Sequence, residues 1–142
     1  MCCKRYAMFI LLVAITLLLC SCFNLTASEQ AYYKNKDNYV KVSGIIKSLD
    51  YNDEKTALYI SFTDLDTSLD DNCFKIIGDN FTIVEENGFE DLVKVGDRVS
   101  FITAPKYFGD GYVMPIVSIT FEDTCFLDFE TGYKNFIDWL YN

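Results

Sequence analysis

The residues that could do chemistry in this chain are its cysteines, because histidine is absent. The 142 residues include six cysteines and no histidine. Without histidine the chain lacks the usual general base and the commonest metal ligand. It also cannot build a Ser–His or Cys–His nucleophilic pair. We therefore expect no enzymatic activity and no cofactor.

Cys22 is the cysteine whose surroundings point to a specific reaction. Two cations, Lys4 and Arg5, precede an apolar run over residues 6–19, and the small Ser21 lies directly before Cys22. This order is typical of a bacterial export signal, whose cations stay on the cytoplasmic side. A thiolate is nucleophilic enough to take up a diacylglyceryl group. The sequence therefore predicts export followed by lipid attachment at Cys22.

The segment resembles the signals of bacterial lipoproteins, in which an apolar residue and two mostly small residues precede the cysteine. The matching residues are Leu19, Cys20, Ser21 and Cys22. Cys20 is the rival acceptor, but it would put bulky Leu19 where the signal peptidase of that family takes small residues. The resemblance implies a signal peptide over residues 1–21 and a palmitate-type lipid anchor on the extracytoplasmic side of the cell membrane, where two acyl chains give durable attachment. An uncleaved anchor helix and a plain secretory signal are the alternatives, and both also place the rest of the chain outside the cytoplasm.

Cys73 and Cys125 are the two cysteines that lie beyond the signal and its lipid site. An extracytoplasmic location permits a disulfide between them. The alternative is two buried thiols that act as small apolar residues. Spacing alone does not show whether the two sulfur atoms meet, so both interpretations stay open.

An acidic loop over residues 64–72 has oxygen ligands at alternate positions, as a calcium-binding loop does. These residues are Asp64, Asp66, Ser68 and Asp70. Leu69 stands where an EF-hand loop has its glycine, and Lys75 stands where it has its closing glutamate. We therefore expect a solvated loop without metal, with a weak calcium site as the alternative.

The charge of the chain argues against nucleic acid as a partner. Removal of residues 1–21 leaves 10 Lys and Arg against 21 Asp and Glu, a net charge of −11. Such a surface repels phosphate backbones, and it repels anionic lipid headgroups beyond the anchor itself. The remaining ~120 residues suffice for one domain with a core.

The pattern of apolar residues predicts one mainly β domain behind a tether. Residues 22–38 are polar and predict a flexible coil near the membrane, with room for a short helix over 29–34. Alternating apolar residues predict five strands. The strands span residues 39–49, 56–63, 73–77, 98–103 and 112–121. Gly44, inside the first strand, predicts a bend or a bulge there.

Two helices complete the expected domain. Asp79 or Asn80 is predicted to cap a short helix that ends at Asn87 and Gly88. Residues 124–142 carry apolar side chains at helical spacing and predict a terminal helix packed on the strands. Gly132 weakens the first turn of this helix.

The order of these elements resembles the OB-fold, a five-stranded, partly open Greek-key barrel with a helix between strands three and four. Residues 39–123 are similar to the small OB-fold domains of bacterial lipoproteins, which are related to the anticodon-binding type. The likeness rests on two stretches: Val42-Ser43-Gly44-Ile45-Ile46, and Lys94-Val95-Gly96-Asp97-Arg98-Val99-Ser100-Phe101. It implies that strands three and five run parallel, which would hold Cys73 and Cys125 apart unless the chain doubles back after Phe121. An antiparallel sandwich is the rival architecture.

OB-folds bind ligands across strands two and three, between the loops that flank them. Here those regions offer Tyr51, Tyr59, Tyr107, Phe108 and Tyr112. Rings flanked by acids suit sugar rings, cationic peptides or a protein surface, whereas nucleic acid needs Lys and Arg beside the rings. The competing interpretation is that these rings fill the core.

The resulting hypothesis is a lipid-anchored, non-catalytic binding or adaptor module outside the membrane, with a protein, peptide or saccharide as its ligand. One alternative is an inhibitor or immunity-type partner of another exported protein. A hydrolase that works through two carboxylates is the other.

Overall fold

The computed structural model describes residues 26–108 and 112–142, so Cys22 and the export signal lie outside the described residues. The chain divides into two compact units, Met1–Ala31 and Tyr32–Asn142. Helix α2 (Ala27–Lys34) runs from the first unit into the second. It starts with a capping box, because the Thr26 N–H donates to Glu29 Oε2 at 2.8 Å and the Glu29 N–H donates to Thr26 Oγ1 at 3.3 Å. The later elements belong to the second unit, which is described here by itself.

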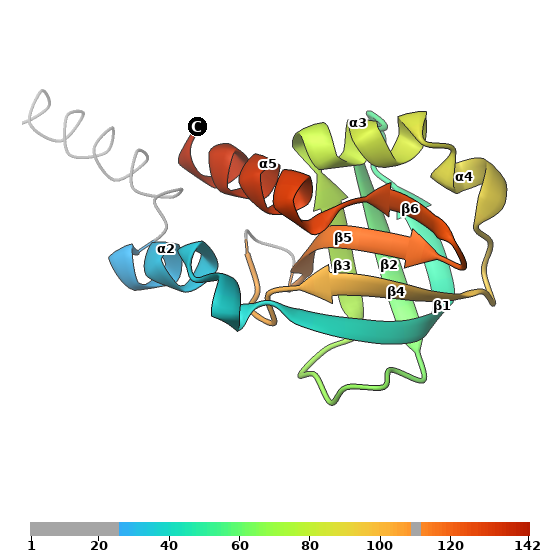
Figure 1. Cartoon of the computed structure of the whole chain (residues 1–142), viewed down its shortest axis with the longest axis horizontal. Coiled ribbons are helices and arrows are strands. Elements are labelled where there is room, and N and C mark those ends of the chain that lie inside the picture. The colour runs from blue at the N-terminus through green and yellow to red at the C-terminus, as the bar shows by residue number, and fades with distance from the viewer. Residues whose placement is uncertain (1–25, 109–111) are drawn as a thin grey trace, which may run out of the picture. The chain divides into compact units, whose positions relative to one another are not determined.

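The second unit is mainly β, as the sequence predicts. Its strands are β1 (Val40–Tyr51), β2 (Ala57–Thr63), β3 (Cys73–Ile77), β4 (Arg98–Thr103), β5 (Met114–Phe121) and β6 (Thr124–Leu127). Neighbours in the order β3-β2-β1-β4-β5-β6 pair antiparallel. A parallel pairing of β3 with β5 then closes a ring of five strands, and β6 is attached to β5 outside that ring (Figure 1).

The core of this unit is built from the alternating apolar residues of the strands. Phe62, Phe74 and Phe101 come from β2, β3 and β4, and their ring centroids lie 4.5–5.5 Å apart. All three side chains are at most 1% exposed, and burying one such side chain contributes about 1.5–3 kcal/mol. Leu58, Ile60 and Phe62, which alternate along β2, are completely buried. The bounds predicted for the third and fourth strands are also those of β3 and β4.

Gly44 is needed because a larger residue would not fit at this position. A Cβ atom at this position would lie 2.7 Å from Leu65 Cδ2 and 3.3 Å from Phe62 Cβ. The shift in register between β1 and β2 falls between Ile46 and Ser48. The bulge predicted at Gly44 is therefore wrong, because the irregularity lies further along the strand, whereas the bend predicted there stays a prediction.

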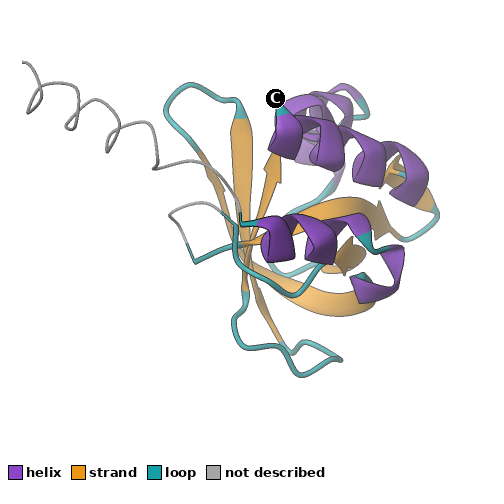
Figure 2. Cartoon of the chain, turned by 90° about the vertical axis from the view of Figure 1, so that its left-hand side faces the viewer, coloured by secondary structure: helices purple, strands orange, loops and turns teal. Residues whose placement is uncertain are grey.

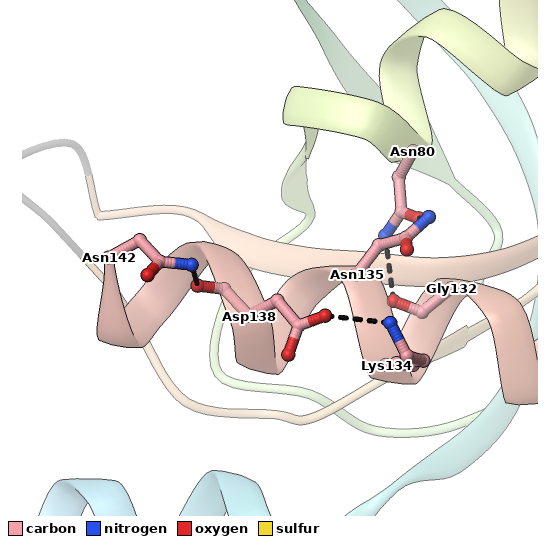
Figure 3. A network of polar contacts seen from close by, with 6 residues as sticks. All are labelled: Asn80, Gly132, Lys134, Asn135, Asp138 and Asn142. Carbon is pink, nitrogen blue, oxygen red and sulfur yellow. Dashed lines mark hydrogen bonds and ion pairs between the residues drawn. The ribbon is translucent and has the colours of Figure 1, made fainter.

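Helix α3 (Gly78–Glu86) follows β3, and the short α4 (Phe89–Leu92) precedes β4. The helix predicted between strands three and four is thus present, and it ends at Asn87 with Gly88 in the left-handed region at φ 81°. The predicted cap is wrong, because the N-cap residue is Ile77 and makes no side-chain cap bond. Asn80 is instead buried and donates from Nδ2 to the Gly132 carbonyl at 2.8 Å (Figure 3).

The terminal segment is a strand followed by a helix. Residues 124–127, predicted as helix, pair with β5 as β6, and α5 (Phe129–Tyr141) begins only after Asp128. Asp128 caps α5 by accepting the Thr131 N–H at 3.0 Å. The hydrogen bonds from Thr131 hold the pKa of Asp128 below its ordinary value. The predicted packing of α5 on the strands is confirmed by its contacts with β5, and α3 lies beside it (Figure 1).

Within the segment predicted as a tether, the short helix allowed for over residues 29–34 is present, and residues 27–38 are more regular than a flexible coil. These residues form α2 and the 3₁₀ helix η1 (Lys36–Asn38). Tyr33 is completely buried, and its ring meets that of Phe136 in α5 at 5.4 Å between centroids. Through this buried aromatic side chain, residues 32–38 are packed into the second unit. The polar composition of the segment does not predict this packing. Figure 2 shows α5, the helix that ends at the C-terminus, beside the strands of the second unit.

Candidate functional site

Tyr107 and Tyr112, called here the tyrosine pair, flank the loop between β4 and β5. Their ring centroids lie 5.7 Å apart with the ring planes at 80°. Tyr107 is 38% exposed and Tyr112 is 75% exposed. An edge-to-face arrangement is favourable for two rings. The pair therefore forms a small aromatic surface that faces solvent.

The residues that follow Tyr107 and Tyr112 in the sequence face the interior of the fold. Phe108 and Val113 form a bridge in which the Phe108 N–H donates to the Val113 carbonyl at 3.2 Å. Both residues are buried. The residues that precede them, Tyr107 and Tyr112, are exposed. Tyr112 has a positive φ of 46°, which few residues other than glycine adopt.

An acidic side chain lies against the tyrosine pair. The Tyr107 hydroxyl donates to Asp71 Oδ2 across 3.4 Å, which is a long hydrogen bond. Desolvation, the negative charge of Asp71 and then this hydrogen bond raise the pKa of Tyr107. Asp70 acts on the hydroxyl in the same direction. The site therefore combines two aromatic rings with one adjacent carboxylate.

The buried Tyr33 holds the backbone that follows β4. Its hydroxyl donates to the carbonyl of Lys106 at 3.0 Å and to that of Tyr107 at 2.7 Å. The Tyr39 hydroxyl in turn donates to the Tyr33 carbonyl at 2.9 Å. The residues just before β1 thus hold the backbone that carries Tyr107.

Phe108, predicted as a ligand contact, is a core residue instead. It is 4% exposed, and its ring centroid lies 5.4 Å from that of Phe136 and 5.8 Å from that of Trp139. The alternative interpretation, that aromatic residues of this region fill the core, is therefore right for Phe108. It does not apply to Tyr107 and Tyr112.

Tyr59 and Tyr51 interact with other residues than the tyrosine pair. Tyr59 pairs with Lys75 across β2 and β3, and the Lys75 ammonium lies 4.8 Å above its ring. The Tyr51 hydroxyl donates to Glu85 Oε1 at 3.1 Å, and its ring packs against that of Phe81. Desolvation, followed by the negative charge of Glu85, raises the pKa of Tyr51. Both tyrosines are therefore engaged in contacts within the fold.

Cys73 and Cys125 are free thiols on different strands. Cys73 pairs with Ser61 of β2, whereas Cys125 is exposed and pairs with Thr120 of β5. Desolvation, followed by the charge of Asp71, raises the pKa of Cys73. The disulfide interpretation is not supported by these positions, and a raised pKa makes a thiol less reactive.

The acidic loop does not gather its oxygen atoms around one point. The Asp64 carboxylate pairs with the Arg98 guanidinium, and Asp66 Oδ1 accepts the Ser43 N–H at 2.8 Å. Among the described residues, no group of three or more His, Cys, Asp or Glu side chains could hold a metal ion. The residues of the calcium alternative, which also include Ser68 and Asp70, thus have no common centre.

Asp71 is the site residue that the sequence reasoning missed. A usable signal was present, since the parallel pairing of strands three and five brings the residues that precede the two strands together. In the structure Phe74 pairs with Met114, so Asp71 and Tyr112 lie just before two paired strands. Cys22, the predicted lipid site, lies outside the described residues.

Comparison of the chain with protein-family models, with curated proteins and with solved structures finds no match. Within residues 26–108 and 112–142, none of the helices has the length and apolar character required to cross a membrane.

Proposed function

We propose that the protein is a lipid-anchored, extracytoplasmic, non-catalytic binding module whose contact surface is the tyrosine pair. The observation that carries this proposal is the geometry of the pair: two solvent-facing rings 5.7 Å apart beside the Asp71 carboxylate. Exposed rings with a polar group at hand are the residues that interfaces use as anchors. In this proposal the two rings contact a partner protein instead of filling the core of the domain.

The address of the module rests on the sequence. The cations Lys4 and Arg5, the apolar run and the lipid-site pattern ending at Cys22 support export and acylation. The strongly acidic composition after the signal supports a partner other than nucleic acid. Together these features argue for a domain that meets its partner at the outer side of the cell membrane.

The proposal includes an OB-like architecture for the ring of strands. The closing of the ring by a parallel β3–β5 pairing and the presence of α3 between β3 and β4 support it. In such a barrel the loop between the fourth and fifth strands borders the ligand surface. The tyrosine pair flanks the corresponding loop here.

The catalytic alternative has less support. A carboxylate hydrolase needs two acids that flank a substrate, and a raised pKa in one of them is a pointer. Desolvation raises the pKa of Glu85, but the Tyr51 hydroxyl occupies its carboxylate at 3.1 Å. That contact favours a structural role for Glu85. An inhibitor or immunity-type role remains a special case of the binding proposal.

The test is capture of a partner by the full acylated chain from detergent-solubilised membranes, with covalent cross-linking before lysis. We expect a partner that is recovered with the unmodified chain and lost with Tyr112→Ala. The matched control is Leu92→Ala, which removes another exposed apolar side chain, at the end of α4. Recovery of the same partner with Tyr112→Ala, whatever the result for Leu92→Ala, would show that the contact surface lies elsewhere.

A further inference from the structure

Lysine side chains lie over five tyrosine rings in the part of the chain that the structure describes, four of them half-buried and one, Tyr141, exposed. Five tyrosines have a lysine ammonium between 4.3 and 5.4 Å from the ring centroid. The pairs are Lys106 with Tyr32, Lys55 with Tyr51, Lys75 with Tyr59, Lys36 with Tyr133, and Lys34 with Tyr141. These distances are within the range in which the negative face of a ring attracts a cation.

The tyrosine pair differs from these rings. Among the described residues, no lysine or arginine lies over Tyr107 or Tyr112, although Lys106 is the direct neighbour of Tyr107 in the sequence. The ammonium of Lys106 is turned to Tyr32, 4.9 Å from that ring. What the pair has instead is an acid, because Asp71 contacts the Tyr107 hydroxyl and Asp70 adds to the local negative charge.

From this contrast we propose that the tyrosine pair binds a lysine or arginine side chain of a partner protein, seated against the ring of Tyr112 and paired with Asp71. This inference rests on the binding function proposed above and names the chemistry that the site takes. A cation gains from the ring face and from the carboxylate at the same place. The net charge of the chain, −9, steers positively charged partners toward it.

A saccharide is the competing occupant, and the charges favour the cation. A neutral sugar ring would stack on Tyr112 but would gain little from a second carboxylate, Asp70, next to Asp71. A cationic side chain gains from both. The two occupants also differ in what they require of residue 112, because a cation needs the electrons of an aromatic face whereas apolar contact needs only area.

The experiment is a calorimetric titration of the full chain in detergent with hexalysine and with the same peptide acetylated on every side chain. Hexalysine is expected to bind and the acetylated peptide to bind at least about tenfold more weakly, since acetylation removes the charge. Tyr112→Phe keeps the ring face, so its affinity should stay within about twofold. Tyr112→Leu keeps apolar area without the ring, so its affinity should fall about three- to fivefold.

The matched charge variants are Asp71→Asn and Asp123→Asn, which remove the same charge beside the pair and at the exposed turn after β5. Asp71→Asn should weaken hexalysine binding about two- to fivefold, and Asp123→Asn should weaken it less. Equal effects of the two variants, or equal affinities of Tyr112→Phe and Tyr112→Leu, would mean that only the general field of the protein binds the peptide, and the proposal would be overturned.

A third measurement separates this proposal from the function on which it rests. If a neutral N-acetylglucosamine tetramer binds, and Tyr112→Leu abolishes that binding, the pair is a contact surface but takes a sugar. If instead the captured partner is insensitive to Tyr112→Ala, the contact surface itself is wrong.

Discussion

Tyr107 and Phe108 are neighbours in the sequence with opposite roles in the fold. Phe108 turns inward to Phe136 and Trp139, whereas Tyr107 turns outward to Tyr112. By composition Tyr107, Phe108 and Tyr112 are equivalent aromatic residues of one loop. Only the bridge between Phe108 and Val113 distinguishes the buried Phe108 from the two exposed tyrosines. At the residue scale, the side of the chain on which a ring lies separates the core residue Phe108 from the rings proposed to bind a partner.

The first prediction compares Phe108→Ala with Tyr112→Ala in urea-induced unfolding. Phe108→Ala should lower the free energy of unfolding by about 3–5 kcal/mol, because it leaves a cavity among aromatic rings. Tyr112→Ala should change it by less than about 0.5 kcal/mol, because the side chain is 75% exposed. Equal destabilisation by both variants would show that Tyr112 is a core residue and would remove it from the contact surface.

At the scale of elements, Gly132 decides how α5 lies on the sheet. A Cβ atom at this position would lie 1.8 Å from the Val117 carbonyl oxygen of β5. The same turn is held from the other side by Asn80, whose Oδ1 also accepts from Asn135 Nδ2 at 3.1 Å (Figure 3). The glycine that weakens the helix by composition is therefore what allows close packing.

The second prediction concerns Gly132→Ala, for which two effects have opposite signs. Helix propensity alone would stabilise the variant by about 1 kcal/mol, whereas the clash with Val117 forces α5 away from β5. We expect the clash to win, with a net loss of at least about 2 kcal/mol in the free energy of unfolding. Lys134→Ala, on the exposed side of the same helix, is the control and should change it by less than about 0.5 kcal/mol. A stabilised Gly132→Ala variant would contradict the close packing.

The elements that periodicity predicts are those whose sequence shows which face is buried. β2, β3 and β4 alternate clearly, so their bounds and inward residues follow from the sequence. β6 and α2 do not. Residues 124–127 become a strand only because β5 offers them hydrogen bonds, and the burial of Tyr33 depends on Phe136, far along the chain. The same limit applies to the site: the loop tyrosines are visible in the sequence, but Asp71 joins them only through the β3–β5 pairing.

For the whole molecule, the proposed anchor and the buried Tyr33 act on the same segment. Tyr33 holds the carbonyls of Lys106 and Tyr107, so a residue between the proposed lipid site and β1 also supports the proposed contact surface. If the protein is anchored as proposed, a tether shortened in this way would keep the domain nearer to the membrane than a coil over residues 22–38 would.

The third prediction is that Cys22→Ser releases the protein from the membrane. The variant should lack the added mass of the acyl chains, should keep its signal uncleaved or processed elsewhere, and should move from the detergent phase toward the aqueous phase in a phase-partition assay, because acyl chains supply the attachment. Cys20→Ser is the matched control and should behave as the unmodified chain. An unchanged mass and partition for Cys22→Ser would refute the anchor and leave the fold and the tyrosine pair unaffected.

The position of β6 outside the ring has a consequence for crowding. Molecules anchored as proposed would be concentrated in a plane, where an open strand edge invites neighbouring copies to extend each other's sheets. β6 is only four residues long, and the Asn87 side-chain amide donates to its Phe126 carbonyl at 2.8 Å. A short edge with one of its acceptors already taken gives a neighbour little to pair with. Densely anchored copies can thus stay separate, with their tyrosine pairs left open to other molecules.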